Sequence, residues 1–163
     1  MSNKFSVWLL IVWLTCLSVS TAIAEESEYG GAPKPGEIIG LWKMIPLADP
    51  GINAVDPWPL PYQWFAFYID GRMASMQKNE DADLSRRELE EILSIVKESA
   101  PTYRFQDDFL IVEYPDAPGQ IEIWGVNIFH KDTRVTKKGD LFMTLAGGDD
   151  GKPVYYRHLR PVD

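Results

Sequence analysis

The chain has 163 residues and a net charge of −8, from 24 acidic and 16 basic side chains, and it contains one cysteine. So acidic a chain, with no basic stripe, is a poor partner for nucleic acid and for anionic membrane surfaces, because both present phosphate groups. The single cysteine excludes an internal disulfide. Aromatic residues make up 12% of the chain, which favours a large apolar core or an aromatic-lined pocket.

The first 24 residues have the layout of a secretory signal peptide. Lys4 supplies the positive charge, residues 5–17 form the apolar run FSVWLLIVWLTCL, and Ala22-Ile23-Ala24 is a small-x-small cleavage pattern. The apolar run is too short for a comfortable membrane span, so an uncleaved anchor is the less favoured alternative. We therefore predict cleavage near Ala24 and a periplasmic or secreted mature chain without a membrane span. Because Cys16 lies within the leader, that mature chain has no thiol.

Residues 25–36 read EESEYGGAPKPG, a polar segment rich in glycine and proline. This composition predicts a disordered arm, because the segment has little apolar surface to bury. The folded domain is therefore expected to span residues 37–163, which is one domain with enough residues for a core.

The first strand is predicted over residues 38–47, with Gly40, Trp42 and Met44 on one face by alternation. Residues 48–61 follow as a long proline-rich loop. Proline cannot donate to a β-ladder, so this segment is not a central strand. A loop of this length inside a compact domain is typical of a functional covering.

Residues 62–78 are predicted to form a β-hairpin around the two-residue turn Asp70-Gly71. Pairing outward from that turn places four apolar side chains on one face, which we interpret as the interior: Phe65, Phe67, Ala74 and Met76.

An amphipathic helix is predicted after the hairpin. Ser85 followed three residues later by Glu88 is a capping box, and the helix is expected to end before Pro101. Its apolar residues recur at helical spacing: Leu89, Ile92, Leu93 and Val96. Such a stripe favours packing against the sheet over the alternative of a partner-binding helix.

The rest of the chain returns to strands. We predict them over residues 102–106, 109–114, 120–130, 133–136, 140–146 and 153–160, with turns rich in Gly and Asp between most of them. The total is about eight or nine short strands in sequential hairpins, which predicts a sandwich or a barrel.

Gly40 and Trp42 form a Gly-x-Trp motif on the first strand. With the long loop, the antiparallel meander and arginine on the last strand, the chain resembles bacterial lipocalin-like (calycin) proteins. The resemblance implies an up-and-down antiparallel β-barrel of about eight strands, here with one helix inserted mid-chain. It also implies that Trp42 lies at the closed end with Arg157 or Arg160 across its ring, a cation–π contact. These two arginines lie on opposite faces of one strand, and the expected direction of that strand favours Arg160 as the inward one. The loop 48–61 then lies over the open mouth.

The favoured hypothesis for function is binding of a small hydrophobic molecule without catalysis. No hydrolase signature or phosphate loop is present, and the two histidines, His130 and His158, fall on different predicted strands, so we predict no cofactor and no metal site. The candidate ligand-binding residues are Trp42, Met44, Trp58, Leu60, Phe65, Phe67, Met76 and Met143. Of these, Trp58 and Leu60 are the candidate lid contacts.

The alternative hypothesis is an envelope protein-interaction module, an inhibitor or assembly factor. In that case the barrel is solid, and Trp58, Trp64 or the helix forms an exposed patch. The internal volume separates the two hypotheses, since a cavity above about 300 Å³ favours a ligand-binding barrel.

Overall fold

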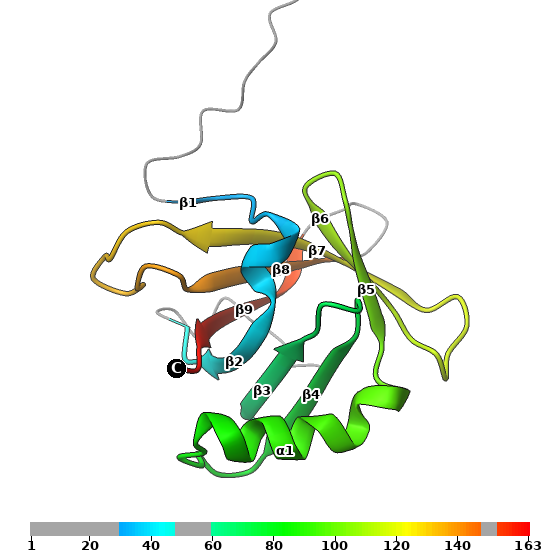
Figure 1. Ribbon diagram of the computed structural model, residues 1–163. Coiled ribbons are helices and arrows are strands. Elements are labelled where there is room, and N and C mark those ends of the chain that lie inside the picture. The colour runs from blue at the N-terminus through cyan, green and yellow to red at the C-terminus, as the bar shows by residue number, and fades with distance from the viewer. Residues whose placement is uncertain (1–29, 48–59, 148–152) are drawn as a thin grey trace, which may run out of the picture.

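The computed structural model describes residues 30–47, 60–147 and 153–163 (Figure 1). These residues form one antiparallel sheet, curled into a half-barrel, and one α-helix. The strands are Gly30–Gly31 (β1), Gly40–Ile45 (β2), Tyr62–Phe67 (β3), Met73–Lys78 (β4), Thr102–Gln106 (β5), Phe109–Glu113 (β6), Ile121–Phe129 (β7), Leu141–Ala146 (β8) and Pro153–Pro161 (β9). The helix α1 spans Arg86–Val96 between β4 and β5, and short 3₁₀ turns cover Pro35–Ile38 and Lys97–Ser99. The predicted mainly β class with a mid-chain helix is confirmed.

The strand order is β4-β3-β2-β9-β8-β7-β6-β5, and β1 adds beside the end of β7. From β2 onward, strands that are consecutive in this part of the chain pair with each other, apart from β4 and β5, which α1 separates in the sequence. The last strand returns to the first long one, so that β9 pairs with β2 from Trp42↔Pro161 to Ile45↔His158. This is the up-and-down order that the predicted series of hairpins implies.

The two edge strands of the curled sheet meet at one corner. The N–H of Met73 donates to the carbonyl of Pro101 at 2.9 Å, and the N–H of Tyr103 donates to the carbonyl of Gly71 at 2.6 Å. The hydroxyl of Tyr103 also donates to the carbonyl of Tyr68 at 2.7 Å. The start of β5 is therefore fastened to the β3–β4 turn.

The β3–β4 turn is longer than the predicted two-residue turn. Phe67 lies opposite Met73, so residues 69–71 form the loop. The N–H of Gly71 donates to the carbonyl of Tyr68 at 3.0 Å, and Gly71 has a φ of +80°. A type I turn followed by a glycine in the left-handed region is the usual three-residue hairpin loop, and it absorbs the extra residue.

This turn shifts the register of the hairpin and corrects the predicted interior face. Phe65 and Phe67 point into the curl together with Met73, as part of the buried inner core. Ala74 and Met76 point to the other side of the sheet, where they pack in the cluster beneath α1. A register change of one residue moves every side chain of a strand to the opposite face, which is why half of the predicted set was wrong.

We expect Gly71→Ala to lower the free energy of unfolding by about 1–2 kcal/mol, measured by urea denaturation. An alanine at Gly71 is strained by the positive φ, and its Cβ meets the carbonyl oxygen of Tyr103 at 3.2 Å. Gly36→Ala is the matched control, because a Cβ at Gly36 meets nothing within 4 Å and φ there is not positive. Equal losses in the two variants would contradict this account of the corner.

The inside of the curl is filled by a buried apolar core. Its members are Ile38, Trp42, Phe65, Phe67, Met73, Leu110, Val112, Trp124, Val126, Ile128, Leu141, Met143, Tyr155 and Leu159. Ile38, from the 3₁₀ turn that precedes β2, is fully buried, and its carbonyl accepts from the indole N–H of Trp42 at 2.8 Å. The turn thereby covers the end of the barrel at which β2 begins.

Helix α1 covers the outer face of β2, β3 and β4 (Figure 1). The predicted capping box is present, since the Ser85 hydroxyl accepts from the Glu88 N–H at 3.4 Å and the Glu88 carboxylate accepts from the Ser85 N–H at 2.9 Å. Leu89 and Leu93 are fully buried against Trp64, itself 1% exposed. The stripe of the helix is thus used for packing on the sheet, as predicted.

The sequence predicts a disordered arm over residues 25–36. Residues 25–29 lie outside the described part of the chain, and for residues 30–36 the prediction is wrong. Gly30 and Gly31 pair with β7 as β1, and Pro35–Ile38 forms a 3₁₀ turn. A Cβ at Gly30 would lie 2.6 Å from the carbonyl oxygen of Ile128, so glycine is what allows the backbone to approach. Composition reports on side-chain burial and therefore does not reveal a strand held by its backbone.

The predicted strand at residues 133–136 is also wrong, because this segment is an ordered loop between β7 and β8. The hydroxyl of Thr133 accepts from the N–H groups of Val135 and Thr136, at 3.2 and 3.0 Å. Threonine is common in strands, but here its hydroxyl bonds the local backbone and replaces a ladder.

Candidate functional site

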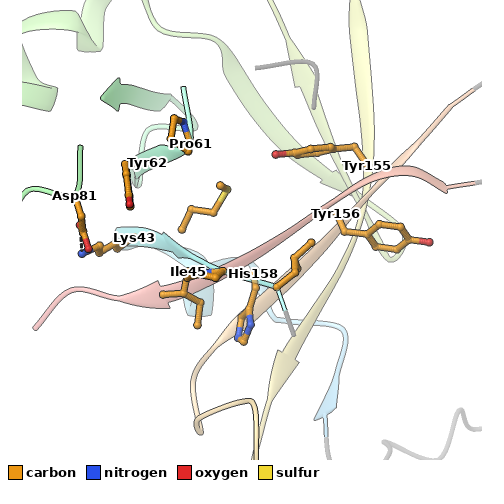
Figure 2. Close-up of a pocket in the computed structure, with 11 residues that line it drawn as sticks. Lys43, Ile45, Pro61, Tyr62, Asp81, Tyr155, Tyr156 and His158 are labelled. Atoms are coloured by element: carbon orange, nitrogen blue, oxygen red, sulfur yellow. Dashed lines mark ion pairs between the residues drawn. The ribbon is translucent and has the colours of Figure 1, made fainter. Parts of the chain in front are cut away.

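A cavity of about 580 Å³ lies where β2 ends and where β3 and β9 begin, so it is at the end of the barrel opposite Ile38. Its lining residues are Lys43, Met44, Ile45, Pro46, Leu47, Pro61, Tyr62, Asp81, Tyr155, Tyr156 and His158, drawn in Figure 2. Most of these side chains are apolar or aromatic, with charged groups in the minority.

Two tyrosines from different strands border this cavity. Figure 2 shows Tyr62 of β3 on one side and Tyr155 of β9 on the other, whereas the rings of Tyr156 and His158 point away from the space between them. Tyr155 is 1% exposed and packs edge to face on Trp124, with ring centroids 6.5 Å apart. This wall of the cavity is therefore continuous with the buried core.

An ion pair contributes the charged groups of the cavity wall. The Lys43 ammonium lies 2.6 Å from a carboxylate oxygen of Asp81 and 5.8 Å from the ring centroid of Trp64. The side chain of Lys43 is 32% exposed, and that of Asp81 is 52% exposed. These two charges cancel, so this ion pair gives the cavity wall no net charge.

Arg157 is the arginine that faces the interior, and the preference for Arg160 was wrong. Arg157 is 3% exposed, and its guanidinium carbon lies 4.5 Å from the ring centroid of Trp124 and 4.8 Å from that of Phe65. On the inner face of β9 the neighbouring residue is Tyr155, whose ring centroid lies 5.7 Å from the same guanidinium carbon. The buried cation therefore lies among aromatic rings next to one wall of the cavity.

A carboxylate lies on the same inner surface of the barrel. Glu122 accepts from the hydroxyl of Tyr114 at 2.8 Å and from the indole N–H of Trp124 at 2.9 Å. Burial, and then the hydrogen bond to Glu122, raise the pKa of the Tyr114 phenol far above its ordinary value. The phenol therefore keeps its proton throughout the physiological pH range and donates a hydrogen bond to Glu122.

Arg160 lies on the opposite face of β9, where it binds Asp140. The guanidinium donates to both carboxylate oxygens of Asp140, at 2.8 and 2.7 Å, and Asp140 also bonds His158 Nε2 at 2.8 Å and accepts from the Lys137 N–H at 2.7 Å. Asp140 is fully buried. Burial alone would raise its pKa, but the bonds from Arg160, Lys137 and His158 outweigh burial and hold the pKa of this carboxyl below its ordinary value.

The structure brings one of the predicted ligand-binding residues, Met44, to the cavity. Four others belong to the buried core and do not line it: Trp42, Phe65, Phe67 and Met143. Met76 packs on the helix side of the sheet. Leu60 is half-buried and is not among the lining residues, and Trp58 lies outside the described residues.

Sequence reasoning missed Tyr62 and Tyr155 as walls of the cavity, and Asp140 as the partner of Arg160. Tyr155 shares the inner face of β9 with Arg157 by alternation, so choosing the correct arginine would have found it. Asp140 lies opposite Arg160 only in the observed register of β8 and β9, in which Leu141 faces Leu159. The turn between these strands is too long to specify that register from the sequence.

In the described part of the chain, no group of three or more His, Cys, Asp or Glu side chains is placed to hold a metal ion. None of the helices found in the same residues has the length and apolar character needed to cross a membrane. In comparisons with protein-family models, with curated proteins and with solved structures, the chain matches none of them.

Proposed function

We propose that this chain is an exported, lipocalin-like protein that binds a small, mainly apolar molecule without catalysing a reaction. The binding site is the cavity between β2, β3 and β9. The observation that carries this proposal is the volume of that cavity, about 580 Å³. Ligand pockets in proteins span roughly 300–1,000 Å³, and this pocket at the open end of the barrel falls within that range.

The lining supports an apolar guest. Met44, Leu47 and Pro61 contribute apolar surface, and burial of such surface is worth about 25 cal/mol per Å². The half-buried Tyr62 adds a hydroxyl that can orient one polar end of the guest. A mostly apolar wall with a few polar groups is the usual composition of a small-molecule site.

The position of the cavity in the barrel also supports binding. One end of the barrel is covered by the 3₁₀ turn with Ile38 over Trp42, and the cavity occupies the other end. Small barrels hold ligands at their mouths, where the strands diverge and side chains no longer fill the interior.

A blocked cavity tests this site. We expect Leu47→Trp, which adds an indole to the cavity wall, to weaken binding of the neutral fluorophore N-phenylnaphthylamine by about tenfold, or about 1.4 kcal/mol. Ile69→Trp is the matched control, because Ile69 is 87% exposed at the tip of the β3–β4 turn. Both variants are first checked for an unchanged thermal midpoint. Equal affinity for the fluorophore in wild type and Leu47→Trp would remove the cavity as the site.

The second candidate function is that of a protein-interaction module. The surface that supports it is not one of those that the sequence suggested. Trp64, Leu89 and Leu93 are buried. The exposed apolar side chains on the outer face of β6 and β7 are Phe109, Ile121 and Ile123, at 46%, 52% and 42% exposed. An apolar outer sheet face is a common interaction surface. If wild type fails to bind the fluorophore, this candidate becomes the better supported one.

A further inference from the structure

The loop between β7 and β8 has a charge opposite to that of the whole chain. Residues 131–138 contain four basic side chains and one acidic one, a net charge of +3 in a chain of −8. The basic residues are Lys131, Arg134, Lys137 and Lys138, and all four are exposed. Val135, between them, is 54% exposed.

This loop is held in one conformation by its own hydrogen bonds. Thr133 bonds the N–H groups of Val135 and Thr136, and its hydroxyl lies 2.8 Å from that of Thr136. The N–H of Lys138 donates to Asp132 at 2.8 Å. In Figure 1 the connection between β7 and β8 projects from the sheet at the left of the molecule. The cations are therefore presented together on a projecting loop whose backbone needs little further ordering on binding.

We propose that this loop docks the protein on an anionic lipid surface, with the basic side chains at the lipid phosphates and Val135 among the headgroups. Basic residues close to such a surface each contribute about fivefold to the partition coefficient. An exposed apolar side chain among cations adds the burial that keeps the contact at the interface. This role is independent of the ligand-binding cavity, which involves none of these residues.

The size and composition of the loop favour a lipid surface over a macromolecular partner. A stable protein interface buries about 1,200–2,000 Å² in total and has aromatic residues at its centre, whereas residues 131–138 contain no aromatic residue and one exposed apolar side chain. Single-stranded nucleic acid is bound by aromatic stacking, which these residues cannot supply. A lipid surface needs only the tip of a loop.

The net charge of the whole chain predicts repulsion from anionic membranes, and the loop is a local exception. Charges more than about 8 Å apart are largely screened at physiological ionic strength. A projecting loop therefore interacts with the lipid phosphates while the acidic remainder of the molecule is screened from them. The same reasoning predicts that binding weakens as salt is raised.

The test is co-sedimentation of the purified protein with vesicles of phosphatidylcholine alone or mixed with phosphatidylglycerol. We expect wild type to bind only the mixed vesicles, and Arg134→Gln/Lys138→Gln to lose about 25-fold in partition coefficient, at fivefold per cation. Arg86→Gln/Arg87→Gln is the matched control, because it removes the same charge from exposed positions of α1. We expect that control to change binding less than twofold.

Three results would overturn the proposal. One is equal binding to the two kinds of vesicle, and another is equal loss in the loop variant and the helix variant. The third is full competition by soluble glycerophosphoglycerol, which would show that the loop recognises a free phosphate and not a surface. Val135→Ser leaves the charge of the loop unchanged, and we expect it to weaken vesicle binding severalfold. That loss would distinguish docking of the loop at the interface from a purely ionic attraction.

Discussion

Trp42→Ala is expected to lower the free energy of unfolding by about 3–5 kcal/mol, measured by urea denaturation. Trp42 is 3% exposed in the inner core, and its indole N–H donates to the Ile38 carbonyl at 2.8 Å. Truncation removes a large buried ring and leaves a cavity beneath the 3₁₀ turn. It also leaves the Ile38 carbonyl without this donor, which adds to the cost.

Trp42→Phe separates the two contributions. It keeps an aromatic ring in the core and removes the donor, so we expect a smaller loss, of about 1–3 kcal/mol. A loss below about 1 kcal/mol for Trp42→Ala would mean that the ring does not cover the end of the barrel, and the assignment of the Gly40-x-Trp42 motif would be wrong.

Asp140→Asn is expected to lower the free energy of unfolding at pH 7 by about 1–3 kcal/mol, because it breaks charge-assisted hydrogen bonds of a buried carboxylate whose partner Arg160 is 39% exposed and keeps part of its hydration. The amide presents one oxygen where the carboxylate presents two, so the bidentate contact with Arg160 is broken. An NH₂ group then faces a guanidinium N–H. The guanidinium loses its compensating charge in a site where Asp140 is fully buried.

The same carboxyl makes the stability depend on pH. Its folded pKa is lowered, so its contribution is complete above the unfolded value, about 3.9, and is lost as pH falls through the folded value. We therefore expect the difference between wild type and Asp140→Asn to shrink as the pH falls below the unfolded value. Asp116→Asn, at an exposed position, is the control and should cost less than about 0.5 kcal/mol. A difference that grows in acid would contradict the assigned direction.

Local signals in the sequence predicted the elements of this fold well. The 102–106 strand has the predicted bounds, and the Ser85–Glu88 box marks the start of α1. The alternation of Trp42 and Met44 gives the inner face of β2 correctly. In each case the signal is a short-range pattern whose physical cause, a cap or a two-residue period, lies within the segment.

Register and backbone-only contacts were not predictable in the same way. The three-residue loop ending at Gly71 moved Ala74 and Met76 to the helix side, because a turn one residue longer inverts the strand that follows it. Gly30 has no side chain and pairs with Phe129 through its backbone, so the composition of this segment gave no sign of the pairing.

The candidate site was predicted less well than the fold for the same reason. The core residues Phe65 and Met143 are apolar and face inward, but apolar character alone does not distinguish a filled interior from the wall of a cavity. The cavity is defined by where β2 ends relative to β3 and β9, and thus by the relative positions of Met44, Tyr62 and Tyr155, which lie far apart in sequence. Among the predicted ligand residues that the structure describes, only Met44 lines the cavity.

Native mass spectrometry of the purified protein tests the central claim, that the cavity at the mouth of the barrel holds a small apolar molecule. The account predicts a reproducible additional mass that organic extraction removes. It also predicts that the extracted protein then binds N-phenylnaphthylamine. The bare mass of the chain in every preparation, with no change in tryptophan fluorescence on titration with fatty acids, haem or quinones, would contradict it.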